Sequence, residues 1–256
     1  MNLSIITVNL NNDKGLEKTL QSVSSQSYDS LEHIIIDGAS TDGSIEILRQ
    51  SKSPKLNFIS EKDKGIYNAM NKGIKMSLGR YCLFLNAGDY LINDTILTRV
   101  FSNDFDEDIV YGDIYFKEKS NLVPGTCVPD KPTLQYLLQS IIPHPASFIK
   151  RSLLNSSGGY NEEYIIVSDW EFILKSLIFN KASYRKIPFF ISVFDKNGIS
   201  SNPQNQSLIL EERKKVLLSL LPEAIINQFE EYEKEVKEFR KLKKNFFLRK
   251  LFRIMK

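Results

Sequence analysis

The 256-residue sequence predicts an α/β fold in which helices flank a mostly parallel central sheet. Three observations support this class. Short apolar, β-branched segments alternate with segments whose apolar residues fall at helical spacing. A polar loop follows each of the early apolar segments, as in a parallel sheet whose strands are joined by helices. The composition, with 42% apolar and 25% charged residues, is that of an ordinary globular protein.

The elements follow in order from these patterns. Leu16, Leu20 and Val23 share one face of a helix, and Ile66, Met70, Ile74 and Leu78 share a face of another at four-residue spacing. A third helix begins at Ser168, with Phe172, Leu174, Leu177 and Ile178 giving it an apolar side. We therefore expect strands over residues 4–8, 33–36, 56–60, 81–85, 109–111 and 189–194, and helices over 16–23, from 45, over 66–78 and from 168.

Two further regions lack this alternation. Residues 120–145 carry many prolines and loop residues, so we expect an irregular segment there that shapes a binding cleft. Residues 208–256 are polar and helical in pattern, and predict a helical extension. His33 precedes an all-apolar strand and is expected to be structural.

Charge and cysteine content restrict the partners and the compartment. Residues 240–256 hold eight Lys and Arg and no acid, and subtracting these eight charges from the net charge of +3 leaves −5 for residues 1–239. An acidic body argues against a nucleic-acid partner. Cys82 and Cys127 form neither a disulfide framework nor a metal cluster, which favours a reducing compartment. The N-terminus predicts neither a signal peptide nor a membrane span, so we expect a cytoplasmic protein that is at most peripheral to a membrane.

Polar segments follow three of the predicted strands, at residues 9–13, 37–44 and 86–89. In open α/β sheets, ligands bind beyond the carboxyl ends of the strands. A carboxylate placed there can hold Mg²⁺ or Mn²⁺ together with the phosphates of a substrate. Asn, Gly and Asp also favour tight turns, so residues 86–89 alone leave open a turn or a cation site.

Several motifs occur in a characteristic order: Thr7-Val-Asn9, Asp37-Gly-Ala-Ser-Thr-Asp-Gly-Ser44, Glu61-Lys-Asp-Lys-Gly-Ile-Tyr-Asn-Ala-Met-Asn-Lys-Gly-Ile74, Leu85-Asn-Ala-Gly-Asp89 and Ser168-Asp-Trp-Glu171. Over roughly the first 200 residues the sequence resembles the family 2 glycosyltransferases. The resemblance implies a GT-A fold over residues 1–205, with a nucleotide-sugar-binding half (1–115) and an acceptor half (116–205), followed by the helical extension 206–256. It also implies a nucleotide-diphosphate sugar donor, a divalent metal and inversion at the anomeric carbon.

The resemblance assigns most of the donor site to strand ends. Asp37 matches a carboxylate that accepts a hydrogen bond from the base, which suits the imide N–H of uracil. Asp63 matches an aspartate that touches the nucleoside, and Gly65 permits close backbone approach. The full set of implied nucleotide-sugar contacts is Thr7, Asn9, Asp37, Ser40, Asp63, Gly65, Asn86, Ala87, Gly88 and His144.

Several of these residues have an alternative interpretation. Asp42 is either an N-cap of the next helix or a ligand contact. Asn68 and Asn71 either bind a ligand or only cover an exposed helix face, and His144 is either a site residue or a structural loop histidine. Trp170 either stacks on a sugar or packs in the core, and core packing is preferred.

The resemblance assigns the metal and the chemistry to two carboxylates. Asp89 matches the last residue of the metal motif, and it would hold Mn²⁺ or Mg²⁺. Asn86 and Gly88 stand where fuller motifs have acids, so we expect weak metal binding without the nucleotide. Asp195 is either a further metal ligand or a turn former, and the turn is preferred. Asp169 matches the general base that takes the proton of the attacking hydroxyl.

The basic tail, residues 239–256, interleaves apolar residues with cations. Such a helix can lie on an anionic membrane surface, which would place the protein on the inner face of the cell membrane. The alternatives are packing against the body or against a second subunit in a homo-oligomer.

The resulting functional hypothesis is an inverting, metal-dependent glycosyltransferase of hexosyl or N-acetylhexosaminyl type. It would move a sugar from a UDP-sugar, the favoured donor, to a hydroxyl of a glycan or lipid-linked acceptor in surface polysaccharide synthesis. The alternatives are a sugar-1-phosphate nucleotidyltransferase and a catalytically degenerate sugar-nucleotide-binding protein.

Overall fold

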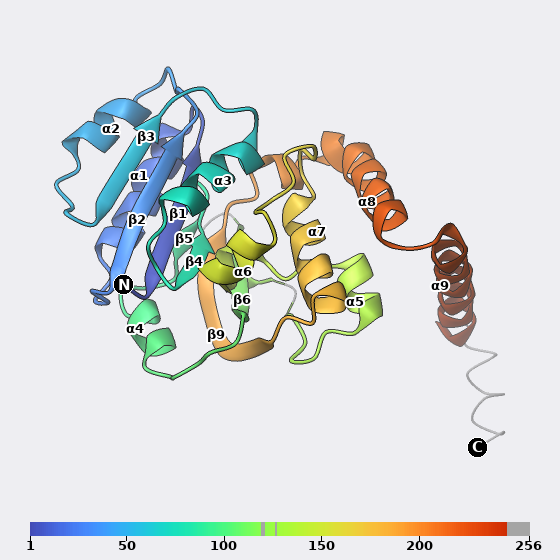
Figure 1. Cartoon of the computed structure of the whole chain (residues 1–256). Helices are drawn as coiled ribbons and strands as arrows, with labels where there is room; N and C mark the ends of the chain where they lie inside the picture. The colour runs from blue at the N-terminus through green and yellow to red at the C-terminus, as the bar shows by residue number, and fades with distance from the viewer. Residues whose placement is uncertain (119–120, 126, 245–256) are drawn as a thin grey trace. The chain divides into compact units, whose positions relative to one another are not determined.

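The computed structural model describes residues 1–118, 121–125 and 127–244 (Figure 1). The chain forms two compact units, Met1–Gln206 and Ser207–Lys256. The second unit holds α8 (Gln206–Leu220) from Ser207 onward and α9 (Glu223–Lys244). Of the predicted basic tail, residues 245–256 lie outside the described residues. Among the helices that are described, none is both long and apolar enough to cross a membrane.

A nine-stranded sheet forms the centre of the first unit, in the order β3-β2-β1-β4-β8-β6-β9-β5, with β7 paired to β6. The strands β3, β2, β1 and β4 are mutually parallel. The strand β8 runs antiparallel to both β4 and β6, whereas β6 and β9 are parallel. The strands are β1 (Leu3–Asn9), β2 (Leu31–Asp37), β3 (Leu56–Ser60), β4 (Tyr81–Phe84), β5 (Tyr90–Leu91), β6 (Ile109–Glu118), β7 (Asn121–Pro124), β8 (Ser147–Lys150) and β9 (Tyr184–Phe194).

The predicted α/β class is confirmed, and the sheet is parallel in its N-terminal part but mixed beyond β4. The change follows from the chain path, because β8 returns beside β4 in the opposite direction. The strand β6 runs through the predicted division at residues 115 and 116. The helix predicted over residues 66–78 ends at Met76, because Ser77 adopts an extended conformation, and Leu78 is left 67% exposed.

Helices cover both faces of the parallel strands, which explains why β1 and β2 are buried along their whole length (Figure 1). Ile35 packs with Leu16 of α1 and Leu48 of α2. Ile6, which points to the opposite face, lies against α3 at Gly73. The α-helices described in the first unit are α1 (Asp13–Ser24), α2 (Ser44–Gln50), α3 (Ile66–Met76), α4 (Ile96–Phe101), α5 (Leu134–Gln139), α6 (Arg151–Ser156) and α7 (Ser168–Leu174). The shorter helical segments are the 3₁₀ turns η1 (His144–Ala146), η3 (Ile199–Ser201) and η4 (Pro203–Asn205) and the π-helical segment η2 (Lys175–Phe179).

The contact at Gly73 gives a stability prediction. A Cβ at this position would lie 2.4 Å from the Cγ2 atom of Ile6. Ala is favoured over Gly in a helix by about 1 kcal/mol, but overpacking a core costs roughly 1–3 kcal/mol. Because the contact at 2.4 Å is with a buried branched side chain, we expect a cost near the upper end, so that Gly73→Ala lowers the free energy of unfolding by up to about 2 kcal/mol, measured by urea unfolding. Trp170, the single tryptophan, lies in the first unit and provides the fluorescence signal.

The matched control is Lys75→Ala in the same helix, at an exposed position. Its effect should stay within about 0.5 kcal/mol. A Gly73→Ala protein as stable as the wild type would show that α3 does not need close contact with β1.

Candidate active site

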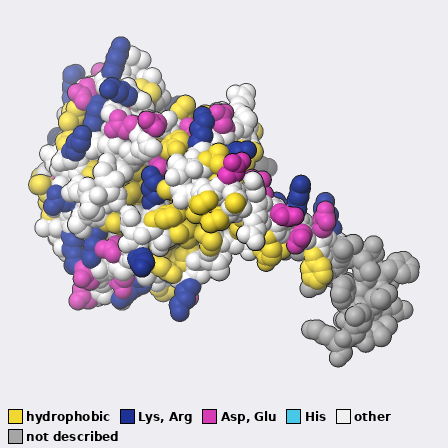
Figure 2. Space-filling model, turned by 45° about the vertical axis from the view of Figure 1, so that its right-hand side comes forward, with side chains coloured by type: hydrophobic (Ala, Val, Ile, Leu, Met, Phe, Trp, Pro, Cys, Tyr) yellow, Lys and Arg dark blue, Asp and Glu magenta, His cyan; other side chains and the backbone are white. Residues whose placement is uncertain are grey.

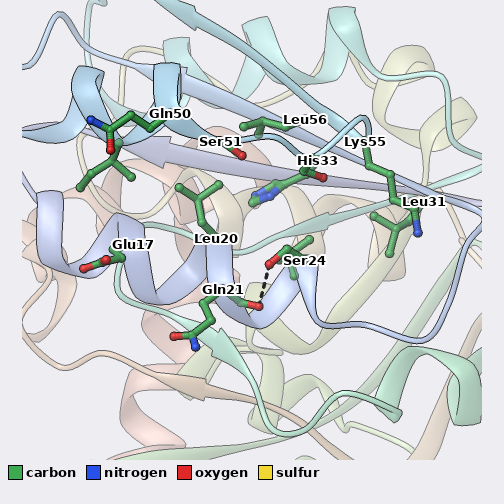
Figure 3. A pocket seen from close by; sticks show the side chains of 13 residues that line it. Glu17, Leu20, Gln21, Ser24, Leu31, His33, Gln50, Ser51, Lys55 and Leu56 are labelled. Carbon is green, nitrogen blue, oxygen red and sulfur yellow. Dashed lines mark hydrogen bonds between the residues drawn. The ribbon is translucent and has the colours of Figure 1, made fainter.

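Two of the cavities in the described part of the first unit differ in the chemistry of their walls. One, of about 430 Å³, lies between α1, α2 and the amino-terminal parts of β2 and β3, and Figure 3 shows its lining. Leu20, Leu31 and Leu56 form much of its wall, and it contains none of the residues predicted for a site. The other, of about 710 Å³, lies at the carboxyl ends of β1 and β4, where ligands of α/β sheets bind.

Eight of the twelve predicted site residues line the larger cavity, although they come from distant parts of the sequence. They are Asn9, Asp63, Gly65, Asn86, Ala87, Asp89, His144 and Asp169. Exposed apolar side chains at its edge include Leu10, Ile165 and Ile199. The cavity therefore combines an apolar entrance with polar groups inside, as in small-molecule sites.

Asp89 lies in the loop that follows β4 and is 2% exposed. Its Oδ1 atom accepts a hydrogen bond from the backbone N–H of Asp195 at 2.8 Å. Its Oδ2 atom has no hydrogen-bond partner among the described residues. Burial raises the pKa of Asp89 to about 6, against the opposing effect of the His144 charge. A buried carboxylate oxygen without a donor is suited to a cation.

The loop around Asp89 is fixed by Thr19 of α1. The Thr19 hydroxyl donates to the carbonyl of Asp89 at 2.6 Å and accepts from the N–H of Gly88 at 3.0 Å. Gly88 has φ of 109°, and a Cβ there would lie 2.6 Å from Asp195 Oδ2. A glycine is therefore needed both for the backbone conformation and for the approach of the second carboxylate.

The described residues contain no cluster of three or more His, Cys, Asp or Glu arranged to hold a metal. Asp89 and Asp195 nevertheless lie side by side at the cavity wall. Two carboxylates fit a hard cation whose other ligands are diphosphate oxygens and water. The donor set thus fits a metal that binds together with a nucleotide.

Asp169 lies in the first turn of α7, and its side chain is 14% exposed. Its Oδ1 atom accepts hydrogen bonds from the hydroxyl of Tyr67 at 3.0 Å and from the backbone N–H of Trp170 at 2.9 Å. Its Oδ2 atom lies 3.3 Å from Nδ1 of His144. Both oxygens are oriented by neighbours while the carboxylate still faces the cavity.

His144 connects the two acidic positions. Its Nε2 atom lies 3.4 Å from Nδ2 of Asn86, on the loop that leads to Asp89. Burial on its own would lower the pKa of His144, but the hydrogen bond and charge of Asp169 and the charge of Asp89 raise it overall. A histidine cation at this position would favour an anionic ligand between the carboxylates.

Four predicted donor contacts do not line the cavity: Thr7, Asp37, Ser40 and Gly88. The hydroxyl of Thr7 is fully buried and bonds to His33 Nε2 at 2.9 Å and to the carbonyl of Leu85 at 2.7 Å. Thr7 therefore bonds within the protein next to the sheet, and its contact with the donor stays a prediction. Gly88 acts through the loop conformation described above.

Asp37 is fully buried beside the cavity residue Asn9. Its carboxylate accepts from Asn9 Nδ2 at 2.8 Å, from the N–H and hydroxyl of Ser40 at 2.9 and 2.6 Å, and from the Ser60 hydroxyl at 2.7 Å. Burial opposes ionisation, but these hydrogen bonds lower the pKa of Asp37 overall. Contact between Asp37 and a base stays a prediction, and it would require one of these donors to move.

The structure also decides several alternatives. Asp42 accepts from the N–H groups of Asp13 and Ser44 at 2.9 and 3.0 Å, so it stabilises the starts of α1 and α2. Trp170 packs in the core, 2% exposed, and its indole N–H donates to the carbonyl of Leu137. His33 is structural, and burial lowers its pKa to about 3.

Sequence patterns did not identify Tyr67 or Glu162 as site residues, although both line the cavity. Asn71, for which the sequence leaves open a ligand contact or an exposed helix position, is 8% exposed and bonds to Tyr160 and Glu162. The signal that could have revealed this network is the spacing of Tyr67, Asn68 and Asn71, because residues three and four positions apart lie on the same side of a helix.

Comparison with known proteins relates the chain to enzymes that transfer sugars. A family model described as Glycosyl transferase family 2 matches residues 4–126. The chain is 32% identical, over 178 residues, to a PGL/p-HBAD biosynthesis glycosyltransferase of Mycobacterium bovis (strain BCG / Pasteur 1173P2), covering 67% of this chain and 68% of that protein.

Solved structures show a similar fold at lower sequence identity. A structure of S. aureus TarS in complex with UDP-GlcNAc has a TM-score of 0.68 and 19% identity, covering 88% of this chain and 69% of that fragment. In a longer TarS structure, the chain spans only 37% of the protein. The mannosyltransferase PcManGT from Pyrobaculum calidifontis, in complex with GDP-Man and Mn2+, has a TM-score of 0.59 and 18% identity, covering 83% of this chain and 60% of that one.

Proposed function

The chain belongs to glycosyltransferase family 2, and on this premise we propose that it transfers a sugar from a nucleotide-diphosphate donor to a hydroxyl group with inversion. The GT-A fold expected from the sequence is confirmed. The observation that carries the proposal is the presence, in one cavity, of an oriented carboxylate, Asp169, and a buried carboxylate with an unpaired oxygen, Asp89.

In the proposed reaction, Asp169 accepts the proton of the attacking hydroxyl. The oxygen of that hydroxyl forms a bond to the anomeric carbon as the bond from this carbon to the diphosphate breaks, and the electron pair leaves on the diphosphate. Inversion requires a base on the side opposite the leaving group. The hydrogen bonds from Tyr67 and Trp170 orient Asp169, so its free lone pairs are directed at the acceptor.

Asp89, together with Asp195, would hold Mn²⁺ or Mg²⁺ against the donor diphosphate. When bound, the metal offsets the charge that develops on the leaving group. His144, between Asp89 and Asp169, would contribute positive charge to the same oxygens. Asn9, Asp63 and Gly65 line the part of the cavity where the nucleoside would lie.

The donor is proposed to be a UDP-sugar of hexosyl or N-acetylhexosaminyl type. Support comes from the TarS complex with UDP-GlcNAc. Because the PcManGT structure is a complex with GDP-Man, the experiment described below also includes a GDP-sugar. We propose a glycan or lipid-linked acceptor in surface polysaccharide synthesis. Attachment of residues 239–256 to an anionic membrane and homo-oligomer formation stay predictions.

The experiment is a thermal-shift screen of UDP-, GDP- and dTDP-sugars with and without Mn²⁺. A ligand that binds only the folded state at 100 times its Kd stabilises it by about 2.7 kcal/mol, which a melting curve detects. We expect one nucleotide class to raise the melting temperature, and more so with Mn²⁺. No shift with any donor would contradict the proposal.

The raised pKa of Asp89 predicts a pH dependence of metal action. With a pKa of about 6, Asp89 is mostly ionised at pH 7.5 and mostly protonated at pH 5. A protonated carboxylate does not bind the cation, so the gain in donor affinity caused by Mn²⁺ should fall about 10-fold between these pH values. Calorimetry with and without Mn²⁺ isolates the effect of the metal, because any change that pH causes in metal-independent donor binding appears in both titrations. If Mn²⁺ increased the affinity for the donor as much at pH 5 as at pH 7.5, Asp89 would be excluded as a metal ligand.

A further inference from the structure

The hydroxyl of Tyr67 contacts the proposed base and a backbone carbonyl at the same time. It lies 3.0 Å from Asp169 Oδ1 and 2.5 Å from the carbonyl oxygen of Ile166. The side chain is 4% exposed and lies in the first turn of α3. Tyr67 thus connects the N-terminal half of the unit to the start of α7, where Asp169 lies.

Several hydrogen bonds fix the relative position of α3 and the segment before α7. Asn71 Nδ2 donates to the carbonyl of Tyr160 at 2.8 Å and to Glu162 Oε1 at 2.9 Å, and its Oδ1 accepts from the N–H of Tyr160. Asn68 Nδ2 donates to Glu162 Oε2 at 2.8 Å. Because this network holds both sides, the distance between Tyr67 and Asp169 is set by the fold.

The tyrosine has one hydroxyl proton and two acceptors. Burial, followed by the charge of Asp169, raises the pKa of Tyr67 well above its usual value, so the group remains a hydroxyl. A charged acceptor attracts the proton more strongly than a carbonyl does. The hydroxyl therefore donates to Asp169 while that carboxylate is ionised, and it can turn to Ile166 once Asp169 is protonated.

We propose that Tyr67 is a positioning residue for sugar transfer, which holds Asp169 in the orientation of a base and provides a partner for both of its charge states. The inference rests on the proposed role of Asp169. Before transfer, Tyr67 donates to Asp169 Oδ1. After Asp169 has taken the acceptor proton, Tyr67 donates to Ile166 and its oxygen can accept from the protonated carboxyl, so Asp169 has Tyr67 as a hydrogen-bond partner in both of its charge states.

Other titratable groups near Asp169 are His144 and Tyr160. His144 also contacts Asn86 and lines the cavity, so its substitution would alter the donor site as well. Tyr160 packs against Tyr67 with ring centroids 5.6 Å apart. The substitution Tyr67→Phe removes only the hydroxyl and retains this ring packing, so it isolates the hydrogen bond.

The first test needs no substrate. In protein labelled with ¹³C at the aspartate carboxyls, the Asp169 resonance is identified by its loss in Asp169→Asn, and its titration is followed with pH. We expect the midpoint in Tyr67→Phe to rise by about 0.5–1 pH unit, because the ionised form loses the stronger hydrogen bond. Tyr111→Phe is the matched control, since its buried hydroxyl donates to the carbonyl of Pro129 outside the cavity. An unmoved midpoint in Tyr67→Phe would overturn the proposal.

A second measurement uses the wild-type protein and does not depend on the stability of a variant. The ¹³Cζ resonance of Tyr67 should titrate with the same midpoint as the Asp169 carboxyl, and it should not do so in Asp169→Asn. If the chemical shift of the Tyr67 resonance did not change as Asp169 ionises, the proposal would be overturned independently of the first test.

Kinetics then separate this inference from the proposed function. With a donor from the thermal-shift screen, Tyr67→Phe should lower kcat about 10-fold and leave the KM for the donor unchanged within about 2-fold. The acidic side of the profile of kcat against pH should shift to higher pH. If Asp169→Asn abolishes transfer but Tyr67→Phe has the wild-type kcat and the wild-type pH profile, the role of Tyr67 is wrong and the proposed function stands. If Asp169→Asn leaves transfer intact, the assignment of the base fails first.

Discussion

Replacing Asp169 by asparagine is expected to lower the rate of sugar transfer by about 100- to 10,000-fold, the range contributed by a general base. The amide retains the size of the side chain and can still accept from Tyr67 and Trp170, but it cannot take a proton from an acceptor hydroxyl. The affinity for the donor nucleotide should remain near the wild-type value, because Asp169 is assigned to the acceptor side. Single-turnover rates and calorimetric donor affinities measure the two quantities separately.

The matched control for this change is Asp94→Asn, an exposed aspartate that does not line the cavity. Its transfer rate should equal that of the wild type. If Asp169→Asn lost donor affinity and rate together, Asp169 would be a donor-binding residue, and a different base would be needed. Undiminished transfer would exclude Asp169 from the chemistry.

The parts of the fold that sequence reasoning predicted well are those where local pattern and tertiary packing agree. Strands β1, β2 and β4 are rich in apolar residues and buried along their whole length because helices cover both faces of the sheet there. The loops that follow β1 and β4 carry polar residues and line the cavity at the carboxyl ends of these strands. The position of Asn86 and Asp89 in the cavity wall therefore agrees with the sequence pattern, while their contacts with a donor or metal stay predictions.

Two of the predicted donor contacts have side chains that already bond within the fold, and their contact with a ligand stays a prediction. Thr7 and Asp37 stand at strand ends, but each points into the protein and bonds to a neighbouring strand or loop. The alternation of a strand does not specify which end residues turn outward, because that depends on the partners supplied by other strands. The resemblance alone therefore could not separate cavity walls from their supports.

The network around Asp169 could not be predicted for a related reason. Tyr67 and Asp169 are 102 positions apart, and their contact depends on how α3 packs beside the segment before α7. In the sequence, Tyr67 cannot be distinguished from the apolar residues of an amphipathic helix. The contact of its hydroxyl with Asp169 exists only in the folded protein, and the same is true of the contacts of His144 with Asn86 and Asp169.

On the face drawn in Figure 2, basic and acidic side chains are interspersed over the first unit rather than separated by sign. An evenly mixed surface provides no long-range attraction for a polyanion. Under the proposed function, the positive charge that attracts the anionic donor would come from groups inside the cavity, namely His144 and a cation at Asp89.

Replacing Asp89 by asparagine is expected to lower the affinity for the donor in the presence of Mn²⁺ by about 100-fold or more. Losing a residue that merely orients a metal ligand typically costs 10- to 100-fold, so losing a ligand should reach at least the upper end. Without metal, the affinity for the donor should change little. Calorimetric titration of the donor with and without Mn²⁺ tests both statements, and Asp130→Asn, at an exposed position, is the control.

The same variant should not be less stable than the wild type, which distinguishes loss of a ligand from loss of the fold. The pKa of Asp89 is about 6 in the folded protein against 3.8 for an unperturbed group, so ionised Asp89 costs folding stability. The cost is absent below about pH 4, fully present above about pH 6, and corresponds to roughly 3 kcal/mol. Asparagine has no charge to bury, so Asp89→Asn should be at least as stable as the wild type at pH 8, with the difference shrinking towards pH 4. A variant that loses donor affinity and also melts earlier at pH 8 would mean that Asp89 holds the loop together rather than the metal.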